Sequence, residues 1–379
     1  MAEVVLASAS EKQIWTTKYL REYVRESGFM PYMGVAEDNI IRVRNELKTE
    51  GGAYINVPLI TRLKGRGVRG AEVLKGNEDD LGNFNDQVRI DWIRNGVKVP
   101  KSTSYKTDID LFDAAKPALR TWDAELLRDD IIDALASIIV PGSTDANGIA
   151  GTDSSVLYAN ASAAQRNTFL TNNSDRILFG NSKSNASSGV WATALGNVDS
   201  TNDKLTASTA LLAKRMARTA GQAAGSINIR PFKSDMTAGR EWYVMFVNSL
   251  SFRDLASDTT IINANTQARA REGDAIERNP LFQDGDLLYG GIIFREIPEI
   301  PVLTGVGAAG IDVGMNFLCG QSAVTVAYGQ DPVFRTDLKE DYEFRPGVAI
   351  EELRGIKKTS YAGRQYGVVT LLNAAVADA

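Results

Sequence analysis

The sequence predicts an α+β fold, and three observations support this prediction. Residues 108–139 carry the longest helical pattern, strand-like runs occur in both halves of the chain, and two of these runs flank a long polar excursion. No segment repeats with a period of about 20–50 residues, which argues against a solenoid or a propeller. The 379 residues suffice for two domains or for one large, elaborated domain.

The N-terminal segment predicts an amphipathic helix. Ser10 begins a Ser-Glu-Lys-Gln capping box, and Gly28 is a suitable helix end. Trp15, Tyr19 and Tyr23 recur at helical spacing and form one aromatic stripe. Such a stripe is more often a buried face than a ligand platform, and little chain surrounds this helix. We therefore expect Trp15 and Tyr19 to contact another subunit.

A hairpin arm is predicted next. Residues 53–60 and 87–93 have strand patterns, and they enclose a polar stretch with five glycines between residues 65 and 82. A structureless loop of this length would be unusual inside a compact domain. We therefore expect the arm to project and to take part in an interface.

The longest predicted helix covers residues 108–139. Pro117 predicts a kink or a restart within it, and Pro141 and Gly142 end it. Residues 142–200 are rich in Ser, Asn, Gly, Thr and Ala with weak periodicity, which predicts surface loops.

The rest of the chain alternates between helix and strand signals. A helix is expected at 203–219, a buried strand at 241–248 and a short helix at 249–255. Residues 258–282 are polar, which predicts a loop. Further strands are expected at 291–297, 312–318, 323–328, 348–353 and 366–372.

Composition excludes several classes of enzyme. The chain has no histidine and one cysteine, Cys319, so Ser-His-Asp catalysis, His-ligated metals, thiolate cages and internal disulfides are ruled out. The formal net charge of −5 argues against a protein built to grip nucleic acid. No signal peptide or membrane-spanning run is recognisable, which predicts a soluble, intracellular protein. We expect no catalytic residue, metal or cofactor.

One motif requires a choice between two interpretations. Residues Gly65 to Gly70 fit the pattern G-x-G-x-x-G of dinucleotide-binding enzymes. That function needs a helix to begin at the third glycine, because the helix N-terminus holds the pyrophosphate. Glycines and asparagines follow Gly70 instead, so a flexible basic hairpin tip is the favoured interpretation.

Three residues in the last part of the chain are candidates for chemical reactivity. Lys357 and Lys358 could bind phosphate or act as amine nucleophiles, but two lysines after a strand are usually solvated. Cys319 lies in an apolar run and is expected to be a small buried hydrophobe.

The order of these elements resembles the major capsid proteins of tailed double-stranded DNA bacteriophages, which have the Hong Kong 97 phage capsid fold. Local strings that carry the resemblance are residues 15–34, 55–94, 279–282 (Asn-Pro-Leu-Phe) and 355–358 (Gly-Ile-Lys-Lys). The resemblance covers nearly the whole chain, and residues 142–200 are its weakest part.

The resemblance implies a domain organisation. Residues 1–50 would form an N-terminal arm and 51–105 the extended β-hairpin loop. Residues 106–199 would form a peripheral domain with the spine helix, 200–335 an axial domain, and 336–379 the return to the peripheral domain.

The resemblance also implies partners. The family assembles as hexamers and pentamers into an icosahedral shell around double-stranded DNA, with packaged DNA held without sequence-specific binding. Scaffolding and portal proteins, and a decoration protein, would be further partners. The protein would belong to the virion and assemble in the host cytoplasm, without a membrane.

Three alternatives remain open at this point. A cellular nanocompartment can have a shell of the same fold. A dinucleotide-dependent enzyme would use Gly65 to Gly70, and a nucleic-acid-binding module would use the basic residues Arg62, Lys64, Arg66 and Arg69.

Charge suggests one contact between subunits. Residues 61–75 contain five basic residues and one acidic residue, a net charge of +4. Residues 336–352 contain six acidic and two basic residues, a net charge of −4. We expect Arg62, Lys64, Arg66 and Arg69 of one subunit to face Glu340 and Asp341 of its neighbour, which would guide register more than affinity. Two unrelated solvated surfaces remain the alternative, because charged runs are usually solvated.

Overall fold

The computed structural model describes residues 28–60, 63, 67–78, 83–106, 111–142, 151–221, 227–235, 240–269, 286–337, 339 and 341–378. The chain divides into two compact units. The smaller unit contains Trp92–Leu127 and Gln330–Leu353, and the larger contains Gly28–Asp91, Arg128–Gly329 and Arg354–Ala379. The mixture of helices and sheets confirms the predicted α+β class.

The core of the larger unit is a mixed sheet with the strand order β11-β12-β10-β14-β19-β8. Strands β14 (Val313–Cys319) and β19 (Val368–Ala374) pair antiparallel, and every one of their residues is buried. Such continuous apolar runs are typical of strands covered on both faces. The other strands are β8 (Ile177–Phe179), β10 (Arg240–Val247), β11 (Asp286–Tyr289) and β12 (Ile292–Glu296), with β9 (Lys233–Asp235) on β10 and β13 (Val302–Leu303) on β14.

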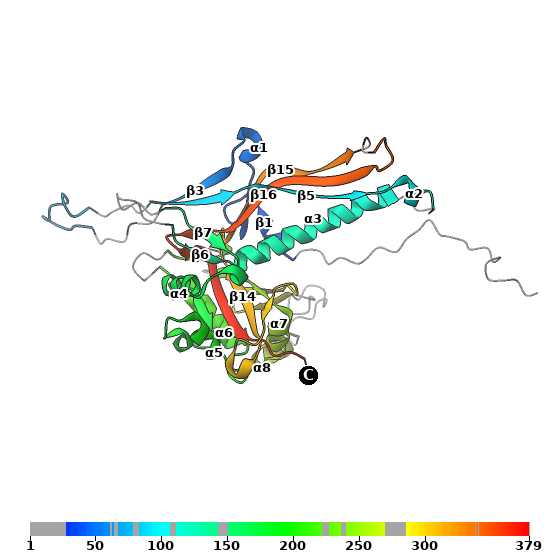
Figure 1. The fold of residues 1–379 in the computed structure, drawn as a ribbon. Coiled ribbons are helices and arrows are strands. Elements are labelled where there is room, and N and C mark those ends of the chain that lie inside the picture. Colours follow the sequence, from blue (N-terminus) through cyan, green and yellow to red (C-terminus); the bar gives the residue numbers. More distant parts are fainter. Residues whose placement is uncertain are drawn as a thin grey trace, which may run out of the picture. The chain divides into compact units, whose positions relative to one another are not determined.

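Helices α6 (Ala207–Thr219), α7 (Ser249–Ala256) and α8 (Thr259–Arg269) lie around this sheet (Figure 1). Thr206 and Asn248 cap the first two helices through their side-chain oxygens. The buried face of α6 consists largely of alanines, which allow the helix to approach the sheet closely: Ala207, Ala210, Ala213 and Ala217. A loop was predicted for residues 258–282, but its first part forms helix α8. The buried side chain of Ile261 holds this otherwise polar segment in the core.

The prediction of surface loops for residues 142–200 is wrong. The described part contains β7 (Ser154–Val156), α4 (Ala163–Asn172), η4 (Lys183–Ala186) and α5 (Trp191–Gly196), besides the short η3 (Tyr158–Asn160). Ser162 and Gln165 form a complete capping box at α4. The ring of Trp191 packs 5.2 Å from that of Phe179 and 6.2 Å from that of Phe169. A few aromatic anchors therefore suffice to fold a segment of mostly small polar residues.

The predicted hairpin is confirmed: β3 (Tyr54–Ile60) pairs antiparallel with β4 (Asn83–Arg89). The expected strand at 87–93 is divided, because pairing changes at Ile90 and β5 (Asp91–Lys98) follows. A Cβ on Gly355 would lie 1.9 Å from the carbonyl oxygen of Arg89, so β16 (Gly347–Lys358) approaches this point too closely for any side chain. Earlier elements of the unit are η2 (Met30–Tyr32), β1 (Met33–Gly34), β2 (Ile41–Arg44) and α1 (Leu47–Glu50).

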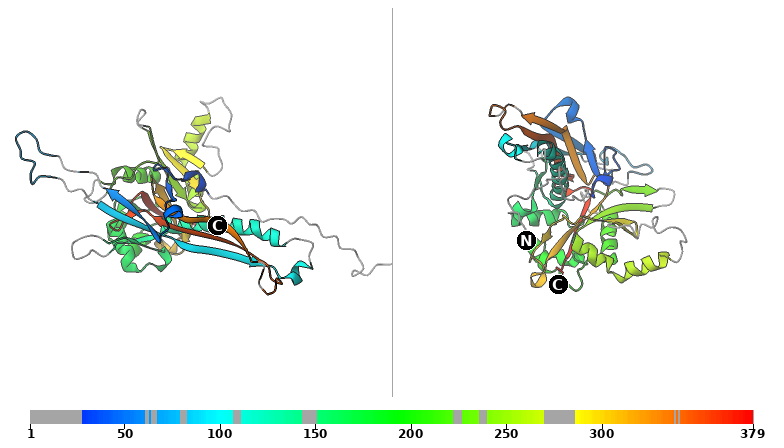
Figure 2. Two further views of the ribbon diagram at one scale, coloured as in Figure 1. Left: turned by 90° about the horizontal axis from the view of Figure 1, so that it is seen from above. Right: turned by 90° about the vertical axis from the view of Figure 1, so that its right-hand side faces the viewer.

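The smaller unit is built on the first part of α3 (Leu111–Ala136), which lies alongside β5 and the adjacent parts of β15 (Val324–Asp337) and β16 (Figure 2). Ala115 and Leu119 of the helix pack on Val348 and Ile350 of β16. The helix continues through Pro117 without a restart, and the short α2 (Lys101–Ser104) precedes it.

The predicted end of the long helix is wrong by a few residues. Helix α3 ends at Ala136, and the β-branched residues 138–140 form β6 (Ile138–Val140), which pairs with β7.

In the described part of the chain, no helix combines the length and apolar character of a membrane span.

Candidate functional site

The base of the hairpin is held by a buried ion pair. Asp86 of β4 is 3% exposed, and its Oδ1 lies 2.5 Å from the Nζ of Lys357 on β16. The same Nζ donates to the carbonyl oxygens of Gln87 (3.2 Å) and Asp153 (2.8 Å), so all three ammonium protons have acceptors. The backbone N–H of Ser360 donates to Asp86 Oδ2 at 3.0 Å. Because both charges are buried and hydrogen-bonded, the pair fixes the hairpin to β16.

The next residue, Lys358, is buried on the opposite face of β16. Its Nζ donates to the carbonyl oxygens of Leu135 (2.9 Å) and Ser137 (2.7 Å) at the end of α3, and lies 5.2 Å from the ring centroid of Phe169. A cation is favourable at a helix C-terminus. Burial nevertheless lowers the pKa of Lys358 to about 7. The expectation that Lys357 and Lys358 are solvated is therefore wrong, because both faces of β16 are covered here.

Asp153 joins the turn between β17 (Ser360–Tyr361) and β18 (Arg364–Gln365) to the segment before β7. Its carboxylate accepts from the backbone N–H of Gly363 at 2.9 and 3.0 Å and from that of Gly142 at 3.4 Å. Burial raises the pKa of this carboxyl group, and these hydrogen bonds oppose the shift.

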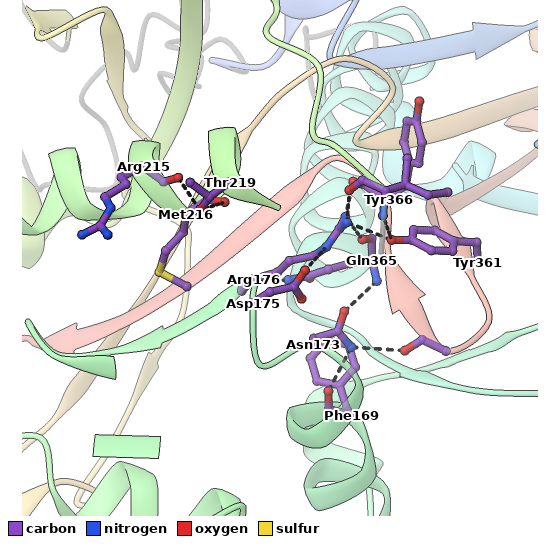
Figure 3. A network of polar contacts seen from close by, with 12 residues as sticks. Phe169, Asn173, Asp175, Arg176, Arg215, Met216, Thr219, Tyr361, Gln365 and Tyr366 are labelled. Carbon is purple, nitrogen blue, oxygen red and sulfur yellow. Dashed lines mark hydrogen bonds and ion pairs between the residues drawn. The ribbon is translucent and has the colours of Figure 1, made fainter. Parts of the chain in front are cut away.

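Arg176 is the centre of a second buried network (Figure 3). Its Nη1 donates to the carbonyl oxygens of Gln365 and Tyr366, both at 2.6 Å, and its Nη2 donates to Tyr361 Oη at 2.8 Å. The Nη2 also donates to the carbonyl oxygen of Ile227. Because one guanidinium serves so many fixed acceptors, it locks the β17–β18 turn beside β8.

A cavity of about 320 Å³ lies between the hairpin strand β3 and strand β2. Arg42 and Arg44 contribute to one wall, since residues two apart on a strand share a face. Residues 57–59 of β3 supply an apolar wall, and Thr325 and Thr359 also line the cavity. The carboxylates of Glu37 and Asp86 line the cavity as well, so its lining combines cationic, acidic and apolar groups.

The hairpin carries apolar side chains that remain exposed on the single chain: Tyr54, Ile60, Leu63, Val73 and Leu74. Gly67, Gly70 and Gly76 adopt positive φ with open space around them, as in a projecting turn. Residues 71–78 form turns and irregular segments, with no helix directly after Gly70. The helix N-terminus required for pyrophosphate binding is therefore missing at this place.

Most of the residues predicted for subunit contacts lie outside the described residues: Trp15, Tyr19, Arg62, Lys64, Arg66 and Glu340. Arg69 lies in the hairpin turn, and Asp341 pairs with Arg345 at 3.3 Å. Within the acidic segment, Glu351 pairs with Arg335 at 2.7 Å and Glu352 is buried. The segment therefore presents less negative charge to a partner than its composition indicates.

The described residues include no group of three or more histidine, cysteine, aspartate or glutamate side chains able to hold a metal ion. Cys319 is buried, as predicted, and burial raises the pKa of its thiol. The buried polar residues Asp86, Asp153 and Arg176 gave no signal in the sequence, since isolated charged residues are usually exposed.

Comparisons with known proteins give matches that cover nearly the whole chain. Residues 3–377 match a family model described as phage capsid protein. The chain is 23% identical over 363 residues to the major capsid protein of Pseudomonas phage KPP25, covering 93% of this chain and 90% of that protein. It also resembles the capsid asymmetric unit of cyanophage Pam1, with a TM-score of 0.88 and 38% identity over all of both chains. The capsid of Ralstonia phage GP4 matches with a TM-score of 0.72 and 22% identity, again over all of both chains.

Proposed function

This chain belongs to the phage capsid protein family, and we propose that it is the major capsid protein that builds the shell of a phage head. The observation that carries the proposal is the match over residues 3–377, together with 38% identity to the Pam1 capsid chain over its full length. These matches favour a viral shell over a cellular nanocompartment. Its role is structural, in the virion.

Copies of the chain would assemble as hexamers and pentamers of an icosahedral shell around double-stranded DNA. Assembly in the host cytoplasm would use scaffolding and portal proteins, and a decoration protein would bind later. The acidic net charge suits a container that must release its DNA, because strong phosphate contacts would hold the genome.

The family resemblance supports an assignment of regions. Residues 1–50 would be the N-terminal arm, 51–105 the extended loop and 106–199 the peripheral domain with the spine helix. Residues 200–335 would be the axial domain, and 336–379 would return to the peripheral domain. The exposed apolar side chains on the β3–β4 hairpin support an interface role, because an isolated two-stranded hairpin is only marginally stable in water.

Electron microscopy and sedimentation of the purified chain, with and without a scaffolding partner, test the proposal. We expect closed shells or extended sheets of regular subunits. A chain that stays monomeric or dimeric under all assembly conditions would contradict it.

The charged segments offer a finer test. Reversing Arg66 and Arg69 to Glu should leave the melting temperature of the subunit nearly unchanged and impair assembly, because the basic segment would face Glu340 and Asp341 of a neighbour. Reversing Glu340 and Asp341 to Lys in the same chain should restore assembly. Normal assembly of the Arg66/Arg69 variant at low salt, where screening is weakest, would exclude this pairing.

A further inference from the structure

The dipeptide Asn95-Gly96 occupies an unusual place in the fold. Asn-Gly is the strongest signal for a two-residue hairpin turn, yet here the pair lies inside strand β5. The neighbouring strand β16 explains the glycine, because a Cβ on residue 96 would lie 3.1 Å from the Cβ of Ala349 and 3.3 Å from the carbonyl oxygen of Val348. Packing therefore accounts for the glycine but not for the asparagine before it.

Gly96 presents its backbone N–H to the open edge of the sheet. Among the described residues, β5 is the outermost strand beside β16. The N–H of Val99 donates to the carbonyl oxygen of Pro346 at 3.0 Å, and the backbone groups of an antiparallel strand alternate between its two edges. The N–H of Gly96, three residues earlier, therefore points away from β16. Because Gly96 is exposed and Asn95 is half-buried, water reaches the pair.

The side chain of Asn95 folds back onto this N–H. The backbone nitrogen of Gly96 donates to Asn95 Oδ1 at 2.9 Å. Because Oδ1 is bonded to Cγ, this hydrogen bond holds the backbone nitrogen beside an electrophilic carbonyl carbon. Gly96 has no side chain that would obstruct an approach of the two atoms. A nucleophile and an electrophile therefore lie next to each other on a solvated edge.

We propose that Asn95 is a site of spontaneous deamidation, with water and hydroxide as the co-reactants. Hydroxide takes the proton of the Gly96 N–H, and the nitrogen attacks Asn95 Cγ. The new N–Cγ bond closes a cyclic imide while the Cγ–Nδ2 bond breaks, and Nδ2 leaves as ammonia after taking a proton from water. Water then opens the imide. Cleavage between the nitrogen and Cγ gives aspartate, whereas cleavage between the nitrogen and the backbone carbonyl carbon gives isoaspartate.

Both products change strand β5. Each adds a negative charge to the subunit, and isoaspartate also lengthens the main chain between residues 95 and 96 by one carbon atom. The longer chain would disturb the register of the residues that follow, whose hydrogen bonds, such as that from Val99 to Pro346, join β5 to β16. Because the subunits of an assembled shell are not replaced, modified copies would accumulate as a shell ages. The reaction itself does not depend on the proposed shell function.

Asn56 provides a matched control within the same chain. It is exposed on strand β3, but the β-branched Val57 follows it and hinders attack by the backbone nitrogen. Its Oδ1 accepts from Asn85 Nδ2 at 3.3 Å. We therefore expect deamidation at Asn95 to be at least several-fold faster than at Asn56. The other Asn-Gly pair of the chain, at 147–148, lies outside the described residues and would be followed in a separate peptide.

Peptide mapping by mass spectrometry tests the proposal on the purified chain, aged at mildly alkaline pH in water enriched in heavy oxygen. The peptide with Asn95 should acquire the mass of the acid together with solvent oxygen, and an isoaspartyl methyltransferase should label it. The variant Asn95→Gln should show neither change in this peptide, because its longer side chain would have to close a larger ring. Equal rates at Asn95 and Asn56 would overturn the proposal. So would an Asn95 that stays intact in the folded chain while the urea-unfolded chain deamidates there.

Discussion

Lys357 and Lys358 are neighbours on one strand, yet their surroundings differ in one decisive respect. Both ammonium groups are buried and hydrogen-bonded, but among the described residues only Lys357 contacts a carboxylate, that of Asp86. Lys358 relies on the neutral carbonyl groups of Leu135 and Ser137 and on the ring of Phe169. Alternation along a strand sends the two side chains to opposite faces.

The difference separates two ways of accommodating a buried cation. On the face of Lys357, removing either partner leaves an uncompensated charge. On the other face, the Lys358 ammonium group can lose its proton, because no carboxylate contacts it among the described residues. Its pKa is already lowered to about 7. We therefore expect one face to respond strongly to mutation and the other to respond to pH.

The largest effect is expected from Lys357→Met. The Asp86 carboxylate would remain buried without its cation, so the free energy of unfolding should fall by about 3–5 kcal/mol. Urea denaturation of the unassembled subunit measures this change. The double variant Lys357→Met with Asp86→Asn should recover part of the loss, and a loss under about 1 kcal/mol for the single variant would show that the pair contributes little.

A smaller effect is expected from pH through Lys358. Between pH 7 and the ordinary lysine pKa of 10.5, the unfolded chain binds a proton that the folded chain has released. Unfolding free energy should therefore rise with pH in this window, and it should be insensitive to Lys358 below pH 7, where both states are protonated. Between pH 7 and pH 9 the gain would be about 2 kcal/mol.

The control for this pH effect is Lys358→Met, which removes the titrating group. Its urea stability curve should lack the rise that the natural chain shows above pH 7. Parallel curves for the two proteins would mean that Lys358 keeps its proton in the folded state.

The smallest effect is expected from Ser360→Ala. Ser360 Oγ donates to Asp86 Oδ1 at 3.3 Å, while the backbone N–H of the same residue keeps its own bond to Asp86. Losing the hydroxyl should cost about 1 kcal/mol, as measured by urea denaturation. A cost as large as that of Lys357→Met would mean that hydrogen bonding, rather than the cation, stabilises Asp86.

Elements with strong local patterns were predictable from the sequence. The apolar runs of β10, β14 and β19 and the first hairpin strand, β3, were placed to within a few residues, because a buried strand needs continuous or alternating apolar residues. The second hairpin strand was expected at 87–93, but the structure divides that range between β4 and β5. Helix α3 was also predicted, apart from its C-terminal end, where tertiary pairing with β7 decides the conformation of residues 138–140.

Features that depend on distant partners were not predictable. Residues 163–196 fold around Phe169, Phe179 and Trp191, which are too few to produce a periodic pattern. The lysine environments follow from segments more than 200 residues away in sequence, such as Asp86 and Leu135. The subunit-contact residues remain predictions, because most lie outside the described part and a contact between copies is a property of the assembly.

The alanine face of α6 also limits how this protein can vary over evolutionary time. Ala210 and Ala213 are fully buried against the sheet, so substitution by a larger side chain would require the helix to move away. Leu211, on the other side of the same helix, is 40% exposed and should accept many replacements. Among descendants of this sequence we expect small residues to persist at every third or fourth position of α6 while the intervening positions diverge.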